Sequence, residues 1–418
     1  MATINSPDPL HKESPPYEEQ GLLLRARQLL PGIIAGAADL DPAAVLTATV
    51  AGASFGYSLG WVVLLCIPVL NTIFSVSSRI GQQTGRGLID LVREYHGQKQ
   101  ATGIAVLIVI VNMAMIIGDI VAVADSCSLV TDLPRVYFLT AIGFIVWYLL
   151  IIGNYQKTTS ALGWISLVLV AYVVAAHQAS GSFLSVAKGV LIPEIPMNAA
   201  YTMGVVAVFG SLLTPDVIVW QTSSRRGLPE GLARAHATES HAGTVVACVI
   251  SLSALVAAAQ LHVADPPSMT TRTAAEALAT FGQLGPVVFS LGIIASGLIA
   301  LPILVASLCF SVSEAFGWES GLSMPPWRAR FFFVTISITV FVATTVDFFG
   351  ISTIKVLYWS QVLAGMVLVP IFVFILFISN SRRLMQTTNT WLQNFWLGCA
   401  AGGMLVSNLL FFWNALFG

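Results

Sequence analysis

The chain has 418 residues, of which 56% are hydrophobic and 9% are charged, and its mean hydropathy is +0.83. Because soluble domains carry about 25% charged residues, this composition excludes a soluble globular protein and indicates a polytopic membrane protein. The formal net charge of −1 does not by itself identify a partner, and we expect the lipid bilayer, not nucleic acid, to surround the chain.

The N-terminal segment is polar. Residues 1–20 contain Pro7, Pro9, Pro15 and Pro16 and lack the apolar run of a secretory signal. This composition predicts a disordered, cytoplasmic segment. Residues 21–30 then lead into the first apolar stretch.

Eleven stretches have the roughly 20 mostly apolar residues that a membrane-spanning helix needs. The predicted spans are 31–53, 58–80, 101–125, 134–153, 159–178, 198–221, 241–262, 283–312, 328–347, 353–378 and 393–416.

Lysine and arginine predict the orientation of these spans. All but four of the 19 basic residues fall in the N-terminal segment or in the loops on its side of the membrane; the exceptions are Arg135, Lys188, Arg272 and Lys355. Cytoplasmic loops carry the excess of basic residues. We therefore expect a plasma-membrane protein with a cytoplasmic N-terminus and, because the span count is odd, an extracytoplasmic C-terminus.

Two of the predicted spans are interrupted at mid-length. The first contains Asp39-Leu40-Asp41-Pro42, and the sixth contains Thr214-Pro215-Asp216. Proline removes a backbone donor, and a carboxylate at bilayer depth is costly and usually functional. Paired interruptions of this kind predict discontinuous helices with a binding site near the membrane midplane.

The position of the interruptions divides the chain. They pair spans 1–5, within residues 21–178, with spans 6–10, within residues 198–378, and leave the span at 393–416 as an addition. The predicted fold is all-α, with two inverted five-helix repeats and an eleventh helix. This is the leucine-transporter type of architecture.

The residues at the interruptions favour a cation. Asp41 and Asp216 supply carboxylates without a basic neighbour in either span, and Thr214, Ser211 and the backbone near Ala38 supply further oxygen atoms. Oxygen ligands suit Mg²⁺, Ca²⁺ and Mn²⁺, whereas sulfur favours later transition metals. We expect a transported ion here and no bound cofactor.

Other polar residues within the spans form a second group of candidates. Asp119 in the third span is a candidate proton acceptor or supporting partner, and Asp39 a candidate for the access path. Gln221 and Gln361 are candidates to reach the cavity. The alternative for each carboxylate is a purely structural hydrogen bond between helices. Asp125 is predicted to be solvated near the outer end of its span.

The sequence resembles the Nramp family of divalent-metal transporters. The resemblance covers residues 20–418 and rests on five short segments, 32–42, 51–57, 79–81, 84–85 and 116–120, and on the proline of the sixth span. Residues 274–278 and 313–318 resemble the Nramp-related magnesium branch. The resemblance implies that Asp41 is a metal ligand and that Asp119 belongs to a proton pathway.

The chain departs from the family pattern at several ligand positions. Ala44 replaces the asparagine of the first span, and Thr214-Pro215-Asp216 replaces the family's Met-Pro-His. Gln221 replaces a second histidine, Ala122 an acidic neighbour of Asp119, and Val367 a glutamine. Relative to the family, these changes predict a weaker preference for Mn²⁺ over Mg²⁺ and doubtful proton coupling.

These observations predict an alternating-access transporter of partly hydrated Mg²⁺ or Mn²⁺. The alternative is a symporter of a non-metal organic or anionic solute on the same fold, because several metal ligands are replaced. We find no nucleophile–base set and no cofactor motif, so we do not expect an enzyme. The sequence leaves the oligomeric state open.

Overall fold

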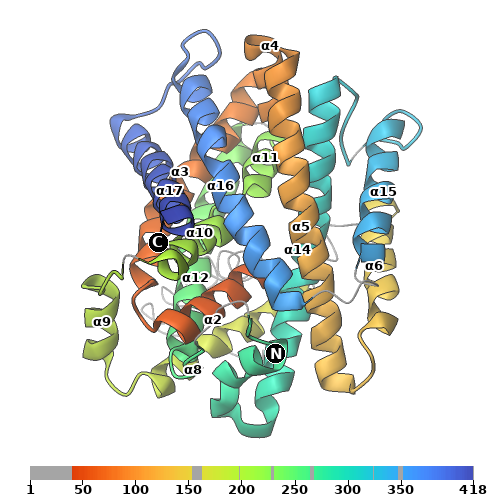
Figure 1. The fold of residues 1–418 in the computed structure, drawn as a ribbon. Helices are drawn as coiled ribbons and strands as arrows, with labels where there is room; N and C mark the ends of the chain where they lie inside the picture. Colours follow the sequence, from red (N-terminus) through yellow and green to blue (C-terminus); the bar gives the residue numbers. More distant parts are fainter. Residues whose placement is uncertain are drawn as a thin grey trace, which may run out of the picture.

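The computed structural model describes residues 40–152, 162–196, 198–226, 230–263, 268–322, 324–346 and 352–417. Within these ranges every regular element is helical (Figure 1). In chain order they are α2 Pro42–Phe55, α3 Gly60–Thr84, α4 Leu88–His96, α5 Gln98–Thr131, α6 Val136–Ile151, η1 Leu167–Val170, α8 Ala171–Ala179, α9 Phe183–Leu191, α10 Ala199–Leu212, α11 Pro215–Ser224, α12 Glu230–Ala258, α13 Thr271–Ala275, η3 Glu276–Leu284, α14 Gly285–Phe316, α15 Arg330–Val346, α16 Thr353–Asn380 and α17 Trp391–Phe417.

Helices occur at all eleven predicted spans. Among the described residues, eight helical segments are long and apolar enough to cross a bilayer, and three shorter apolar helices stand at the first, fourth and ninth predicted spans. Because α2 has 14 residues, it is about 21 Å long, less than the roughly 30 Å of a bilayer core. This length fits the second half of an interrupted span.

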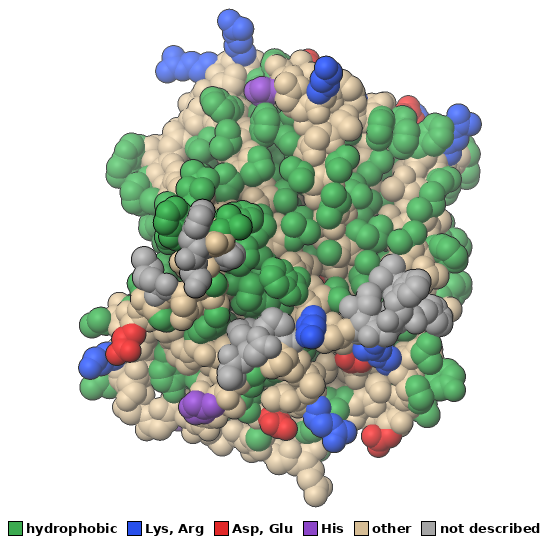
Figure 2. All heavy atoms as spheres, viewed as in Figure 1, with side chains coloured by type: hydrophobic (Ala, Val, Ile, Leu, Met, Phe, Trp, Pro, Cys, Tyr) green, Lys and Arg blue, Asp and Glu red, His purple; other side chains and the backbone are tan. Residues whose placement is uncertain are grey.

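The outer surface is apolar around the middle of the molecule. Phe144 on α6, Phe341 on α15 and Trp413 on α17 are all more than 60% exposed. Figure 2 shows hydrophobic side chains covering the middle of this face, while most charged side chains lie nearer its two ends. A soluble protein rarely exposes so large an apolar area, so this belt is the lipid-facing surface of a multi-pass membrane protein.

Small residues allow the inner helices to approach closely. A Cβ atom at Gly52 of α2 would lie 1.9 Å from the carbonyl oxygen of Leu255 on α12. A Cβ at Gly210 of α10 would lie equally close to the carbonyl oxygen of Gln361 on α16. Glycine at helix crossings brings backbones together in membrane proteins. The last turn of α10 is therefore held directly against α16.

Two regions differ from the predicted elements. α9 is a short additional helix between the fifth and sixth predicted spans, with Phe183 and Leu184 largely exposed. Glu314, which follows the predicted eighth span, lies in the last turn of α14 and is only 1% exposed. The predicted disordered segment 1–20, Ala38 and Asp39 lie outside the described residues.

Candidate functional site

The sixth predicted span is interrupted where the sequence indicates. α10 ends at Leu212 and α11 begins at Pro215, so Leu213 and Thr214 connect the two helices. Thr214 has extended backbone angles, φ −67° and ψ 143°, and is the N-cap of α11. Proline is favoured at the first helical position because its missing N–H would be unpaired there anyway. The interruption places Asp216 in the first turn of a new helix.

Asp41 occupies the matching position at the start of α2. It is the N-cap residue, and its Oδ1 accepts a hydrogen bond from the backbone N–H of Ala44 at 2.5 Å. Pro42 follows as the first helical residue. A carboxylate is favourable at a helix N-terminus because it satisfies a free N–H and faces the positive end of the helix dipole. The sequence Asp-Pro thus explains both the helix start and the position of the charge.

Asp119 of α5 lies near these two carboxylates. Asp41 and Asp216 are close enough for their charges to interact, and Asp119 interacts with both. Asp119 is fully buried and faces the backbone N–H of Ala43 in the first turn of α2, although neither of its oxygens has a described hydrogen-bond partner of standard geometry. Oδ1 of Asp216 also lacks such a partner. Three residues from three different helices therefore bring acidic groups together inside the molecule.

No described basic residue forms an ion pair with Asp41, Asp119 or Asp216. Burying carboxylates is costly unless positive charge or hydrogen bonds compensate them. The cluster can therefore hold protons or a cation. Within the described residues, however, no three His, Cys, Asp or Glu side chains are close enough together to hold one metal ion. A cation bound between two of these carboxylates would need hydroxyl, carbonyl or water oxygens as well.

The other predicted site residues take different positions. Thr214 is 5% exposed, and its hydroxyl lies beside the Asp216 carboxylate. The Ser211 hydroxyl donates to the carbonyl of Val208 in its own helix, at 3.0 Å. Gln361 is fully buried beside α10, with no described partner for its Oε1. Gln221 lies more than one turn from Asp216, and its Oε1 accepts from Nε of Arg225 at 3.5 Å.

One contact that supports the first turn of α11 could not be predicted from the sequence. Ser307 of α14 donates a hydrogen bond to the backbone carbonyl of Asp216 at 2.9 Å. The amide of Asn112 on α5 donates in turn to the Ser307 hydroxyl at 3.5 Å. Together they tie the first turn of α11 to the adjacent α5 and α14. Ser307 gave no signal, because serine is common within the apolar sequence of α14.

A bundle of membrane helices with a mid-length interruption and buried carboxylates is typical of transporters with discontinuous helices, among them the leucine-transporter class of fold. Solved structures agree with this class. The manganese transporter of Eremococcus coleocola matches with a TM-score of 0.67 at 16% identity, covering 97% of each chain. MhsT in complex with L-phenylalanine matches with a TM-score of 0.59 at 13% identity, covering 93% of this chain and 98% of that one.

The chain belongs to the Nramp family, described as natural resistance-associated macrophage protein-like, whose pattern matches residues 32–414. It is 27% identical over 368 residues to the divalent metal cation transporter MntH of Deinococcus radiodurans, covering 82% of this chain and 80% of the relative. The Klebsiella pneumoniae protein of the same name is 25% identical over 395 residues, covering 90% and 91%. Family membership confirms the predicted resemblance to the Nramp family, and it agrees with the prediction that the chain is not an enzyme. The resemblance to the magnesium branch stays a prediction.

Proposed function

We propose that this protein transports divalent metal cations across the membrane by alternating access, with the ion held between Asp41 and Asp216. The observation that carries the proposal is the pair of buried carboxylates at two helix starts, without a described basic partner. The curated relatives named above are divalent metal cation transporters, and one similar solved structure is a manganese transporter.

The donor atoms favour a hard cation. The hydroxyl of Thr214 and the carboxylate of Asp216 supply oxygen at the position where the family pattern has sulfur and imidazole nitrogen. Mg²⁺ and Mn²⁺ accept such ligands, and Mg²⁺ retains much of its water. We infer a partly hydrated Mg²⁺ or Mn²⁺ as the substrate. The resemblance of residues 313–318 to the magnesium branch supports the same choice.

Asp119 is the proposed coupling residue. Its buried carboxylate interacts with both proposed ligands and has no described basic partner, so binding of a cation would change the electrostatic free energy of a proton there. Gln221 cannot carry a proton, and Ala122 replaces the second acid of the family pathway. Proton coupling through this chain would therefore depend on Asp119 rather than on a relay.

The test is uptake of Mn²⁺ and Mg²⁺ into proteoliposomes containing the parent protein, Asp41→Ala or Asp216→Ala. We expect each variant to lose at least about tenfold in uptake rate, because each removes a charged ligand from a buried site. Glu319→Gln is the control, since Glu319 forms an exposed ion pair with Arg328 and should not affect uptake. Unchanged uptake in both aspartate variants would exclude this site.

A second candidate function is symport of an organic or anionic solute. Two observations favour it: no three-residue metal cluster exists among the described residues, and the similar MhsT structure holds L-phenylalanine. Calorimetric titration of the purified protein with Mn²⁺ and Mg²⁺ separates the two functions. Binding heat that disappears in Asp41→Ala supports the metal substrate, whereas the absence of heat with either ion supports the organic one.

A further inference from the structure

Asp125 joins three helices at the end of the molecule opposite α4. It lies on α5 six residues beyond Asp119, which is about 9 Å along the helix. Its Oδ2 accepts hydrogen bonds from the hydroxyls of Thr271, at 3.0 Å, and of Thr353. Its Oδ1 lies 3.4 Å from Nη1 of Arg135. The sequence predicted a solvated Asp125, but only 20% of its side chain is exposed.

The two threonines belong to distant parts of the chain. Thr271 is the first residue of α13, and Thr353 is the first residue of α16. Each therefore stands at the start of its helix, and both donate a side-chain hydroxyl to the same carboxylate. The Asp125 side chain of α5 thus connects α13, which precedes α14 in the chain, to the start of α16. The last turn of α10 also packs against α16.

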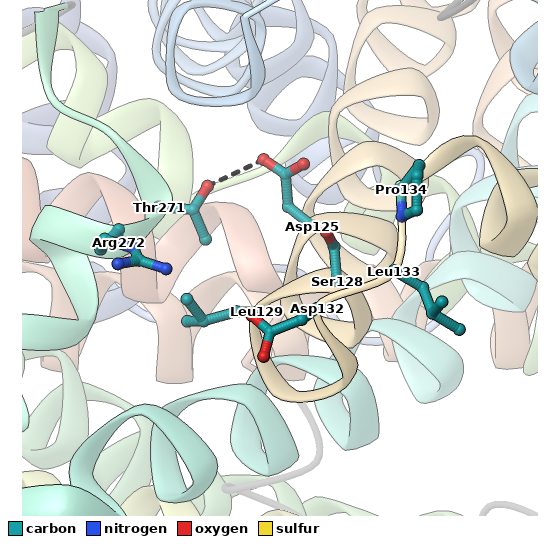
Figure 3. A pocket seen from close by; sticks show the side chains of 8 residues that line it. All are labelled: Asp125, Ser128, Leu129, Asp132, Leu133, Pro134, Thr271 and Arg272. Atoms are coloured by element: carbon teal, nitrogen blue, oxygen red, sulfur yellow. Dashed lines mark hydrogen bonds between the residues drawn. The ribbon is translucent and has the colours of Figure 1, made fainter.

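Two hollows, both open to the surface, adjoin at this contact. One, of about 370 Å³, extends toward Asp132 and Arg272, and the other, of about 400 Å³, extends toward Arg135 and Lys355. Asp125 and Thr271 line both hollows. Figure 3 shows these two side chains turned toward each other, joined by the hydrogen bond. The Asp125–Thr271 pair therefore lies on the boundary that the two hollows share.

The charges around the hollows do not form an ion site. Each hollow has acidic and basic side chains in its lining, and Asp125 already accepts from two hydroxyls and faces Arg135. Hydrogen bonds to a carboxylate are stronger than neutral ones, yet a partly exposed carboxylate can exchange them for water. These properties suit a contact that holds helices together and can open reversibly.

We propose that Asp125, Thr271 and Thr353 form a latch that closes the access path to the buried carboxylates at this end of the molecule. Release of the two hydroxyls lets α13 and the first turn of α16 move away from the end of α5, joins the two hollows and admits water toward Asp119. The proposal rests on the transport function above for the existence of an access path. The identity of the transported ion does not enter it.

The test measures how fast a buried thiol becomes accessible. Ala122→Cys places the thiol three residues after Asp119, on the same face of α5 and fully buried. Cys127→Ala removes the nearest native thiol from the same helix. The protein in lipid nanodiscs is treated with a charged methanethiosulfonate, and mass spectrometry follows modification of the peptide from α5.

Thr271→Val and Thr353→Val keep the side-chain shape and remove the hydroxyl. We expect each to accelerate labelling about tenfold, the effect of losing a hydrogen bond to a charged group. Thr353→Ser retains a hydroxyl and should restore the parent rate. A faster rate in both valine variants with restoration by serine supports the latch.

Two matched controls separate the latch from local effects. Thr131→Val makes the same replacement at the same end of α5, where the hydroxyl donates only to Cys127 of its own helix among the described residues. Asp132→Asn removes a charge from the first hollow at a left-handed position that asparagine tolerates. Both should label at the parent rate. Labelling of the Thr271 and Thr353 variants at the rate of Thr131→Val would overturn the proposal.

The labelling result can be distinguished from failure of the proposed ion site. If Asp41→Ala and Asp216→Ala retain uptake while Thr353→Val accelerates labelling, the results support the latch and exclude the proposed ion site. If a valine variant is not monodisperse by size exclusion, Thr353→Ser and the other valine variant still decide the question, because each is compared directly with the parent.

Discussion

At the residue scale, Thr214 connects the two helices of the interrupted span. It is the N-cap of α11, yet its side chain makes no capping hydrogen bond to the backbone. Its hydroxyl instead lies beside the Asp216 carboxylate. The helix start therefore depends on Pro215 and the extended backbone, and the Thr214 hydroxyl is free of a capping role in the proposed ion site.

Thr214→Met should shift the substrate preference toward Mn²⁺. A thioether is a soft ligand that binds Mn²⁺ better than Mg²⁺, and the substitution removes a hard oxygen from the proposed site. We expect the Mn²⁺-to-Mg²⁺ ratio of uptake rates to rise about tenfold in a competition assay. Thr214→Val removes the hydroxyl without adding sulfur, so an equal shift in both variants would contradict a role for the thioether.

At the element scale, Glu314 connects the far end of α11 to α14 and α4. Its carboxylate accepts hydrogen bonds from the hydroxyl of Ser223, at 2.5 Å, and from the N–H of Ile89, at 3.0 Å, and it pairs with Arg226. The N-cap residue of the short helix α4 is Gly87, which has no side chain to accept a hydrogen bond from the first turn. Glu314 supplies this acceptor from α14. This buried contact orders the end of the molecule where α4 lies (Figure 1).

Gly87→Ala should destabilise this junction. A Cβ at Gly87 would lie 1.9 Å from Oε1 of Glu314, so the carboxylate would have to move away from Ile89. Overpacking and a lost hydrogen bond together cost about 1–3 kcal/mol. We expect a melting temperature several degrees below that of the parent in detergent, measured by tryptophan fluorescence.

The matched control for this change is Gly103→Ala in α5. A Cβ at Gly103 meets no other atom within 4 Å, and alanine favours a helix interior. This variant should melt at or slightly above the parent temperature. If Gly87→Ala and Gly103→Ala have the same melting temperature, the contact with Glu314 does not constrain the position of α4.

At the scale of the whole molecule, the distribution of basic residues predicts which ends face the cytoplasm. Eleven spans and a cytoplasmic N-terminus place the C-terminus outside the cell. Alkaline phosphatase fused after Gly418 should therefore be active in a bacterial host, because the enzyme folds only outside the cytoplasm. The same reporter fused after Thr387, between α16 and α17, should be inactive. The reverse pattern would invert the proposed orientation.

The interruptions and the spans could be predicted because their causes are local. Proline is favoured at the first position of a helix, and here it directly follows the N-cap residues Asp41 and Thr214, so α2 and α11 begin at the predicted points. A run of about 20 apolar residues is long enough to cross a bilayer regardless of its neighbours. The sequence by itself therefore determined the helical membrane fold, the positions of the apolar helices and the helix starts at which Asp41 and Asp216 enter the interior.

Contacts between distant helices could not be predicted in the same way. Asp119 approaches Asp41 and Asp216, Ser307 binds the Asp216 carbonyl, and Thr353 binds Asp125 across 228 positions of sequence. These pairings depend on the rotation and depth of each helix, which are set by close packing at residues such as Gly210. Only the tertiary structure decided them, because one residue of helix rotation turns a side chain about 100° away from its partner.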